Sequence, residues 1–336
     1  MMQRRQLLQL GMGLGLGLGH GLGVHAAARE SLVWQERSLV GFGTTLWLKA
    51  AHTDASRLHE ALEASVKAIR AVEKQMSLFD PDSALCRLNR VGELRKPDPE
   101  LVSVLTLAQY VSRRSAGVFD VTMQPLWGLW SLHSQSQTLP SSKALSQTRS
   151  LVNWQAMTVS ADVVRLHAKG MGVSLNGIAQ GYAADKVRAV LQSHGVQHAL
   201  IDTGETALLG QTPKGRDWRF AVEPSVASTG APPVIHPHGL ATATSSDAHT
   251  AFSADHRHHH ILNPHTGDSP THWATVSVIA PSCAMADALT KVFFMCPPQA
   301  IERMAKAWGV GVVLQDKRGK WFVTDIARAK IMSTLT

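Results

Sequence analysis

Five histidines lie between residues 256 and 265, in the stretch HRHHHILNPHTG at 256–267. Imidazoles are ligands of zinc and copper, and a single imidazole is also a general base near neutral pH because its pKa is about 6.5. A zinc site would need ligands at set spacing with supporting cysteines or carboxylates elsewhere, and the sequence has no obvious second cluster. The tract therefore favours adventitious metal binding or one catalytic histidine among surface residues over a dedicated zinc site, which stays open as an alternative.

Other segments along the chain combine glycine with acidic or hydroxyl side chains. Such residues gather at the ends of helices and strands, where ligands bind. Each segment alone is a weak signal. In order they are MSLFDPDSALCRLN (76–89), GVFDVTMQPLWGLW (117–130), SLNGIAQGYAADKV (174–187), IDTGETALLG (201–210), ATSSD (243–247) and ADALTKVFF (286–294).

Helices are predicted between these segments from the spacing of apolar residues. Apolar residues recur at helical spacing from 53 to 76. A second helix begins after the cap residue Asp98, has Pro99 in its first turn and ends near Gly117. Further helices are predicted at 178–195, 284–295 and 299–308.

Strands are predicted where β-branched and apolar residues form short runs. The first spans 39–50, with Gly41 and Gly43 at a bend, and the chain closes with a hairpin at 310–323. The other predicted strands are 163–167, 171–175, 198–202, 206–210, 218–222 and 274–280. Residues 133–150 are predicted to be an exposed loop or a short surface helix, and residues 225–239 a loop. Helices and strands do not alternate regularly, so we expect an α+β fold.

The N-terminus has the three parts of a secretory signal peptide. A paired Arg4-Arg5 precedes a Leu/Gly-rich run, and small residues follow at 26–28. The arginine pair and the mildly apolar run indicate the twin-arginine export route. Glycines and His20 interrupt the run, which falls short of the roughly 20 apolar residues of a membrane span. We therefore expect a signal peptide at 1–28, one domain at 29–336, a periplasmic location and no stable membrane insertion.

Composition indicates a folded globular protein, with 44% hydrophobic and 17% charged residues. The net charge of +8 permits acidic partners without identifying one, and we expect no nucleic-acid partner. The three cysteines are Cys86, Cys283 and Cys296, and none forms a CxxC pair. An odd number argues against a disulfide framework, so we expect mostly buried thiols.

Together with the histidine tract, which lies between the last two of them, these six segments resemble in their order the FAD:protein FMN transferase family, the ApbE-like flavin transferases. Those proteins carry M-S-x-(Y/F), F-D-x-T, D-L-x-x-I-A-K-G-Y-A-x-D, A-T-S-G, H-x-I-D-P-x-T-G and A-D-A-L-x-T-A. The resemblance runs from about Gly41 to the C-terminus. The variant SLNGIAQGY further resembles the branch associated with nitrous-oxide-reductase maturation.

The resemblance implies an ApbE-like fold and a Mg²⁺-dependent transfer of FMN. The donor is FAD, the acceptor is a Ser/Thr hydroxyl of an exported FMN-binding protein of a membrane redox complex, and AMP is released. His260 matches the histidine of H-x-I-D-P, which implies that it is the general base, and the other four histidines match no motif position. The implied magnesium ligands are Asp287 and the backbone carbonyl of Gly177. The implied FAD contacts are Phe42, Phe79, Val118, Phe119, Asp120, Ser174, Gln180, Gly204, Glu205 and Leu262.

Structural roles compete with several of these assignments. Asp287 could cap a helix N-terminus, and Phe119 could be a core residue. Gly204 and Glu205 could form a plain hairpin turn. Asn263, where the family has aspartate, could form an Asx turn before Pro264. Asp80 and Asp82 are expected to organise a turn beside Phe79, whose ring suits a flavin or adenine.

The chain departs from the family pattern at the metal site. The family has threonine four residues after the metal aspartate, whereas this chain has Lys291 there and Thr290 one residue earlier. One residue turns a helical side chain by about 100°, so Thr290 does not simply replace the missing ligand. Lys291 could place an ammonium near the phosphates or displace the metal. Three further positions differ from the family. Ser174 stands where the family has Asp, and Gln180 stands where it has Lys or Glu. Phe42 stands where it has Met.

Two other functions stay open from the sequence. One is a FAD-binding carrier or degenerate homologue without transferase activity. The other is a histidine-rich metal-binding accessory protein.

Overall fold

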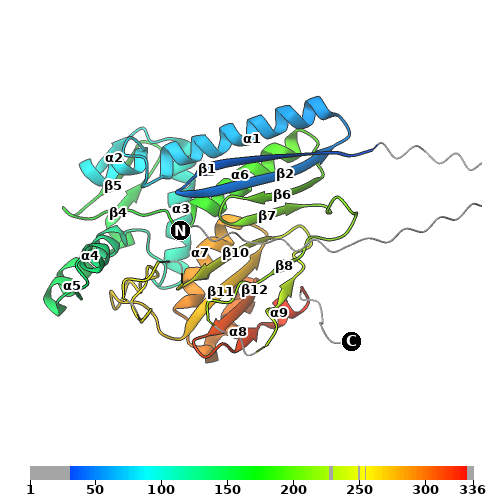
Figure 1. The fold of residues 1–336 in the computed structure, drawn as a ribbon. Helices are drawn as coiled ribbons and strands as arrows, with labels where there is room; N and C mark the ends of the chain where they lie inside the picture. The colour runs from blue at the N-terminus through cyan, green and yellow to red at the C-terminus, as the bar shows by residue number, and fades with distance from the viewer. Residues whose placement is uncertain (1–30, 227–229, 249, 254, 331–336) are drawn as a thin grey trace, which may run out of the picture. The chain divides into compact units, whose positions relative to one another are not determined.

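The computed structural model describes residues 31–226, 230–248, 250–253 and 255–330 (Figure 1). The predicted signal peptide at 1–28 lies outside the described residues. The chain divides into two units, Met1–Ser31 and Leu32–Thr336, and the second is described here.

Eight strands form one sheet in the order β1-β2-β6-β7-β10-β11-β12-β13. Every neighbouring pair is antiparallel, which agrees with the predicted α+β class. The strands are β1 (Val33–Gly41), β2 (Thr44–His52), β6 (His198–Asp202), β7 (Thr206–Leu209), β10 (Ala241–Ser246), β11 (Trp273–Ala280), β12 (Gly311–Asp316) and β13 (Trp321–Val323).

Three helices pack in one layer against this sheet: α1 (Ala55–Met76), α6 (Ala179–Ser193) and α7 (Cys283–Phe294). Helix α1 contacts β1 and β2, α6 contacts β6 and β7, and α7 contacts β10 and β11; α6 also packs between the two other helices (Figure 1). The Asp54 carboxylate caps α1 by accepting from the backbone N–H groups of Ser56 and Arg57. The shared core lies between sheet and helices, so residues on α6 and α7 meet there.

A second group of elements lies beside this layer. It contains α2 (Ala84–Val91), α3 (Pro99–Arg114), and a small sheet of β3 (Glu93–Arg95), β5 (Val163–Leu166) and β4 (Met157–Val159), with α4 (Gln124–Gln135) and α5 (Ser142–Arg149) farther out (Figure 1). Asp98 caps α3 as predicted, by accepting from the Glu100 N–H. The remaining elements are η1 (Trp154–Ala156), β8 (Phe220–Ala221), β9 (Val234–Ile235), η2 (Pro298–Ala300), α8 (Ile301–Trp308) and α9 (Asp325–Arg328).

Some predicted elements differ from the structure. The segment predicted as one bent strand at 39–50 is strand on both sides of the bend, but it is two strands, because β1 and β2 form a hairpin that turns at Phe42 and Gly43. Phe42 adopts a φ of 50°, which is uncommon for a residue with a side chain. The segment 171–175 is not a strand, and residues 218–222 keep only the two-residue β8. Helix α5 falls within 133–150, as the surface-helix alternative predicted.

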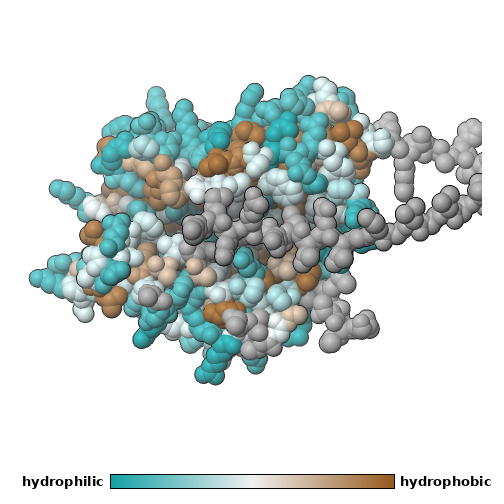
Figure 2. All heavy atoms as spheres, in the orientation of Figure 1, coloured by the Kyte–Doolittle hydropathy of each residue, from teal (hydrophilic) through white to brown (hydrophobic). Residues whose placement is uncertain are grey.

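The surface and the cysteines agree with a folded globular chain. Figure 2 shows hydrophilic and neutral residues over most of the visible face, with apolar residues in separate groups. Within the described residues, no helix is both long and apolar enough to cross a membrane. Cys283 and Cys296 are buried and Cys86 is partly buried, and all three are free thiols.

Candidate active site

Helix α7 is anchored to α6 at its first turn. The Asp185 carboxylate on α6 accepts hydrogen bonds from the backbone N–H groups of Cys283 (2.9 Å) and Ala284 (3.0 Å). The helices cross closely at Gly181, where a Cβ would lie 2.8 Å from the Cα of Ala284 and nearer still to the Cys283 carbonyl. This crossing brings Asp287, in the second turn of α7, beside the start of α6.

Asp287 is buried, with 1% of its side chain exposed. One carboxylate oxygen, Oδ2, lies 3.4 Å from the backbone N–H of Gly181. The other, Oδ1, forms an ion pair with the ammonium group of Lys291, one turn later on α7. Ser282 is the cap of α7, so the alternative that Asp287 caps this helix is wrong.

Thr290 points elsewhere, as its position one residue earlier on the helix predicts. Its hydroxyl donates to the backbone carbonyl of Asp287 (2.7 Å) and lies 2.7 Å from the hydroxyl of Ser245 on β10. Both oxygens of the Asp287 carboxylate and the Thr290 hydroxyl therefore already have protein partners. In the part of the chain that the structure describes, no group of three His, Cys, Asp or Glu side chains could hold a metal ion.

The residues around Asp287 do not fit a magnesium site. Mg²⁺ takes oxygen ligands in octahedral geometry, and a protonated amine is no ligand at all. The Lys291 ammonium lies against the carboxylate oxygen that a divalent cation would need. The resemblance predicted ligands at Gly177, Asp287, Thr290 and Lys291; these are brought together, but as an ion pair and a hydroxyl network.

Gly177 lies directly under the Lys291 side chain. A Cβ on Gly177 would be 3.2 Å from Cε of Lys291 and 3.6 Å from the ring of Phe119. The absence of a side chain at 177 thus lets the lysine stem and the Phe119 ring approach the same stretch of backbone. Phe119 is 5% exposed, so it is a core residue that also borders this site.

The turn between β6 and β7 completes this side of the site. Gly204, with a φ of 97°, lies against the side-chain amide of Gln180, and a Cβ there would collide with that amide. The buried carboxylate of Glu205 accepts a hydrogen bond from the Thr244 N–H on β10 (2.9 Å). The hairpin-turn alternative is therefore correct for the backbone, and this turn also lies beside α6.

Phe42 and Phe79 meet at the tip of the first hairpin. Phe79 is 66% exposed, and its ring lies over Gly43, whose Cβ position would be 3.2 Å from the ring. The Phe42 N–H donates to Glu73 on α1 (2.8 Å), which holds the tip in place. Asp80 accepts from the Asp82 N–H (2.9 Å) and so organises the turn, as predicted.

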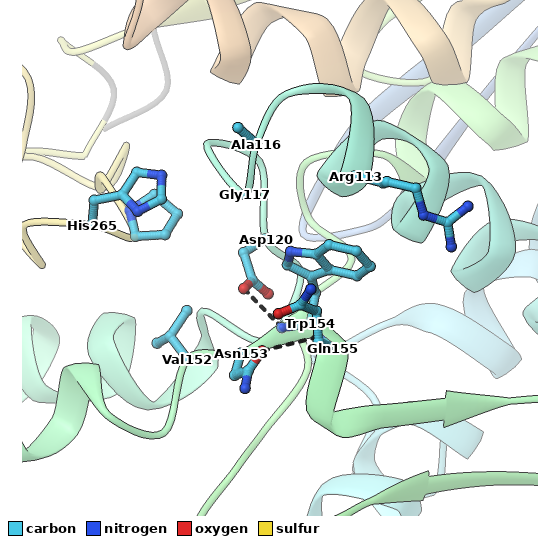
Figure 3. A pocket seen from close by; sticks show the side chains of 10 residues that line it. Arg113, Ala116, Gly117, Asp120, Val152, Asn153, Trp154, Gln155 and His265 are labelled. Atoms are coloured by element: carbon cyan, nitrogen blue, oxygen red, sulfur yellow. Dashed lines mark hydrogen bonds between the residues drawn. The ribbon is translucent and has the colours of Figure 1, made fainter.

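Gly117 and Asp120 line a cavity of about 590 Å³ (Figure 3), whereas the predicted contacts Val118 and Phe119 are not among its lining residues. Figure 3 shows Trp154 and His265 on opposite sides of this cavity. Asp120 accepts from the backbone N–H of Trp154 (2.9 Å) and from both the backbone N–H and the hydroxyl of Thr122. Burial raises the pKa of the Asp120 carboxyl, although these hydrogen bonds oppose the rise. Asp120 therefore holds two chain segments together at the cavity wall.

Ser174 lies close to the segment 118–121. Its backbone N–H donates to the Val121 carbonyl (2.8 Å). The loop before α6 is therefore fixed beside the 118–121 segment, although no described contact shows the Ser174 hydroxyl facing the cavity.

The histidine tract separates into different environments. His258 stacks on Trp130 (centroids 4.7 Å apart) and lies 2.7 Å from the Asp268 carboxylate. His259 is fully buried, and burial lowers its pKa to about 4. His260 is partly exposed, and its Nδ1 lies 3.2 Å from the backbone carbonyl of Thr250. The three imidazoles do not converge on a metal position.

The loop after the tract is held by its own turn. The Asn263 side chain accepts from the His265 N–H (2.9 Å), which confirms the predicted Asx turn. Leu262 is buried in a small cluster with Leu126, Trp130 and Phe252, and so supports the loop from below.

The structure joins most of the predicted residues into one region. Eight of them are linked, either by direct contact or through one intervening residue: Phe119, Gly177, Gln180, Gly204, Glu205, Asp287, Thr290 and Lys291. The histidine loop reaches this region twice, through the His259 and Phe294 rings (6.0 Å) and through His265 at Gly117. No described contact links Phe42, Phe79 or the His260 ring directly to Asp287.

Three supporting residues were missed by sequence reasoning: Asp185, Trp130 and Trp154. Asp185 lies within the 174–187 segment, so the sequence could have indicated it as a candidate site residue. Trp130 donates from its indole N–H to the Gly267 carbonyl (2.8 Å) over a separation of 137 residues. No local sequence pattern predicts a contact over this separation.

Comparison with known proteins identifies the family. The sequence profile of the ApbE family matches residues 42–314. A FAD:protein FMN transferase of Klebsiella pneumoniae is 27% identical over 278 residues, 79% of each chain, and one of Vibrio cholerae is 30% identical over 259 residues, 74% of this chain and 77% of that relative. The crystal structure of apo flavinyl transferase ApbE from Pseudomonas stutzeri is 25% identical, with a TM-score of 0.78 over 90% of this chain and 98% of the other. The resemblance predicted from the motifs is confirmed, and the chain belongs to the ApbE family.

Proposed function

We propose that the protein is a FAD:protein FMN transferase. It moves FMN from FAD to a Ser or Thr hydroxyl of an acceptor protein, forms a phosphodiester bond and releases AMP. The support is that both relatives described above are named FAD:protein FMN transferase.

One observation carries the proposal: residues from separate segments of the chain meet around Asp287. Phe119, Gly177, Gln180, Gly204 and Glu205 come from three different segments between residues 119 and 205, and α7 adds Asp287 and Lys291. An apolar ring, glycine backbone, an amide and charged groups in one place suit a flavin nucleotide with its pyrophosphate. Each segment alone would be an ordinary turn or helix start.

The transfer needs an activated hydroxyl and a stabilised leaving group. The acceptor oxygen forms a bond to the phosphorus on the FMN side of FAD, and the bond from that phosphorus to the bridging oxygen breaks. AMP leaves with the bridging oxygen, and the hydroxyl proton goes to a base.

His260 suits the role of base. When its Nδ1–H donates to the Thr250 carbonyl, the neutral ring carries its lone pair on Nε2. A proton from the acceptor hydroxyl can then be taken by Nε2. The tract around His260 is fixed by His258, which is held by Trp130 and Asp268.

Magnesium dependence stays a prediction of the resemblance. In a magnesium-dependent transferase the ion would neutralise the pyrophosphate beside Asp287. The donor groups of this chain do not fit the ion, because Lys291 pairs with the carboxylate that would bind it. No step of the proposed transfer is therefore derived through magnesium.

The acceptor is proposed to be an exported FMN-binding protein of a membrane redox complex, and the enzyme to be periplasmic. The support is the paired Arg4-Arg5 and the signal-like residues 1–28. An acceptor in the nitrous-oxide-reductase system stays a prediction from the SLNGIAQGY variant.

A gel assay tests the proposal. The protein is incubated with FAD, with and without Mg²⁺, and with a candidate FMN-binding acceptor, and covalent flavin fluorescence is read on a denaturing gel. We expect labelling by the wild type, loss of labelling in His260→Ala and retention in His256→Ala, which changes an exposed histidine of the same tract. Tight FAD binding without labelling of any acceptor, with or without a divalent ion, would refute the transferase.

A second function, FAD binding without transfer, is favoured by one observation. The Asp287–Lys291 ion pair closes the position that the family uses for its cation. The same assay separates the two functions, because a carrier binds FAD and labels nothing.

A further inference from the structure

Lys291 is placed at the site and not on the outer surface. Its side chain is 23% exposed, its stem passes over Gly177, and its ammonium group contacts both the Asp287 carboxylate and, at 3.3 Å, the Asp287 backbone carbonyl. Each of these contacts belongs to a residue at which the family's metal ligands were predicted. The ammonium therefore lies among the residues that were predicted to hold the cation.

The nearby basic residues of α6 are committed to other acids. Lys186 pairs with Glu100 (2.7 Å) and Arg188 pairs with Asp185 (2.8 Å). Asp287, by contrast, has Lys291 as its ion-pair partner, one helical turn away. An Asp–Lys pair at this spacing is stable on a helix, and burial of the carboxylate makes its separation costly.

A lysine in place of a divalent cation changes the charge that a bound pyrophosphate would meet. A divalent cation with Asp287 gives a net charge of one positive, whereas Lys291 with Asp287 gives zero. The lysine can still donate hydrogen bonds to phosphate oxygens, because an ammonium group has three donors. It supplies a fixed positive end without any dependence on free metal.

We infer that Lys291 replaces the divalent cation of this site, so that the protein binds no Mg²⁺ at Asp287 and handles the FAD pyrophosphate with a built-in ammonium group. The second half rests on the proposed transferase function. The first half concerns cation binding alone and is tested without turnover.

The first experiment measures Mg²⁺ binding by calorimetry and by thermal shift, with and without FAD. The variants are Lys291→Thr, which restores the family's threonine, the double variant Lys291→Thr/Asp287→Asn, and the control Lys67→Thr on the exposed face of α1. We expect no Mg²⁺ response in wild type and Lys67→Thr, a rise in melting temperature in Lys291→Thr, and loss of that rise in the double variant. Two results would overturn the inference. One is that the wild type binds Mg²⁺ as well as Lys291→Thr does. The other is that Lys291→Thr binds Mg²⁺ no better than the wild type.

The second experiment measures FMN transfer in EDTA and in millimolar Mg²⁺. We expect wild-type transfer to be unchanged by EDTA, and Lys291→Thr to lose transfer in EDTA and regain it in Mg²⁺. Lys291→Met removes the charge and is expected to lose on the order of 100-fold in rate under both conditions. Wild-type transfer that EDTA abolishes and Mg²⁺ restores would overturn the role of Lys291.

The two experiments keep the conclusions apart. Lys291→Met leaves the buried Asp287 carboxylate without its ion-pair partner and can fail to fold; Lys291→Thr in Mg²⁺ then carries the test. If no protein transfers flavin under any condition, the proposed function fails, and the Mg²⁺ titration still decides whether lysine has replaced the ion.

Discussion

Acid destabilises this fold through His259, a residue next to the proposed base but with a different role. The imidazole is fully buried, its Nε2 lies 3.2 Å from the Pro270 carbonyl, and its Nδ1 meets no hydrogen-bond partner among the described residues. The neutral ring, with Nε2–H donating to Pro270, is therefore the form that the fold accepts. Burial accordingly lowers the pKa of His259 from 6.5 to about 4.

The sign and size of the effect follow from these two pKa values. Between pH 6.5 and 4 the unfolded chain binds a proton at His259 that the folded chain does not bind, so the free energy of unfolding falls as the pH falls. The stability is fully present above pH 6.5 and is lost as the pH approaches 4. The difference of 2.5 pKa units corresponds to about 3 kcal/mol at pH 4, and to about 2 kcal/mol at pH 5.

The assay is chemical denaturation at pH 7, 6 and 5 for the wild type, His259→Leu and His256→Leu. We expect His259→Leu to be less stable than the wild type at pH 7 and to lose about 2 kcal/mol less between pH 7 and 5. His256 is exposed, so its variant should follow the wild-type curve. A His259→Leu curve parallel to wild type would show that the buried imidazole does not carry this pH dependence.

Two further predictions concern the supports of the site. Gly181→Ala forces a Cβ against Cys283 and Ala284, so we expect denaturant titration to show a free energy of unfolding lower by about 1–3 kcal/mol. The control Gly128→Ala lies in α4, where a Cβ meets nothing within 4 Å, and is expected to be neutral or stabilising. Equal losses of stability in the two variants would contradict the crowding at residue 181. Trp130→Phe removes the indole bond to Gly267, so we expect faster hydrogen exchange at residues 258–267 with α6 unchanged, and no such change in Trp127→Phe on the same helix. Unchanged exchange in Trp130→Phe would show that the loop is held by other contacts.

The sequence was informative where a residue type and its neighbours define a role. Asn263 before Pro264 predicted an Asx turn, and Asp98 before Pro99 predicted a helix start; both are present. Local chemistry decides both cases, because the side chain bonds to the backbone two residues away. The same local logic could have found the Asp287–Lys291 pair, since an i,i+4 spacing of opposite charges on a helix predicts contact.

Sequence reasoning failed where the outcome depends on distant residues. The hairpin at Phe42 was predicted only as a bend, because a phenylalanine, not a glycine, takes the first left-handed position of the turn. The segment 171–175 has the composition of a strand, but Val173 bonds instead to the Asn89 side chain on α2, 84 residues away. Such a bond replaces the ladder of a sheet and has no periodic signal.

The proposed base, His260, and the proposed cationic group, Lys291, are held in place by different parts of the fold. Lys291 is held inside a packed helix layer, fixed by Gly181 at the α6–α7 crossing and by Asp185 at the first turn of α7. His260 lies on a loop that side chains attach to α4 and to the end of α7, chiefly through Trp130 and the His259–Phe294 contact. Local opening of a loop costs less free energy than opening of a helix layer. Changes at Trp130 should therefore reduce FMN transfer while FAD binding is kept, whereas changes at Gly181 should weaken both together.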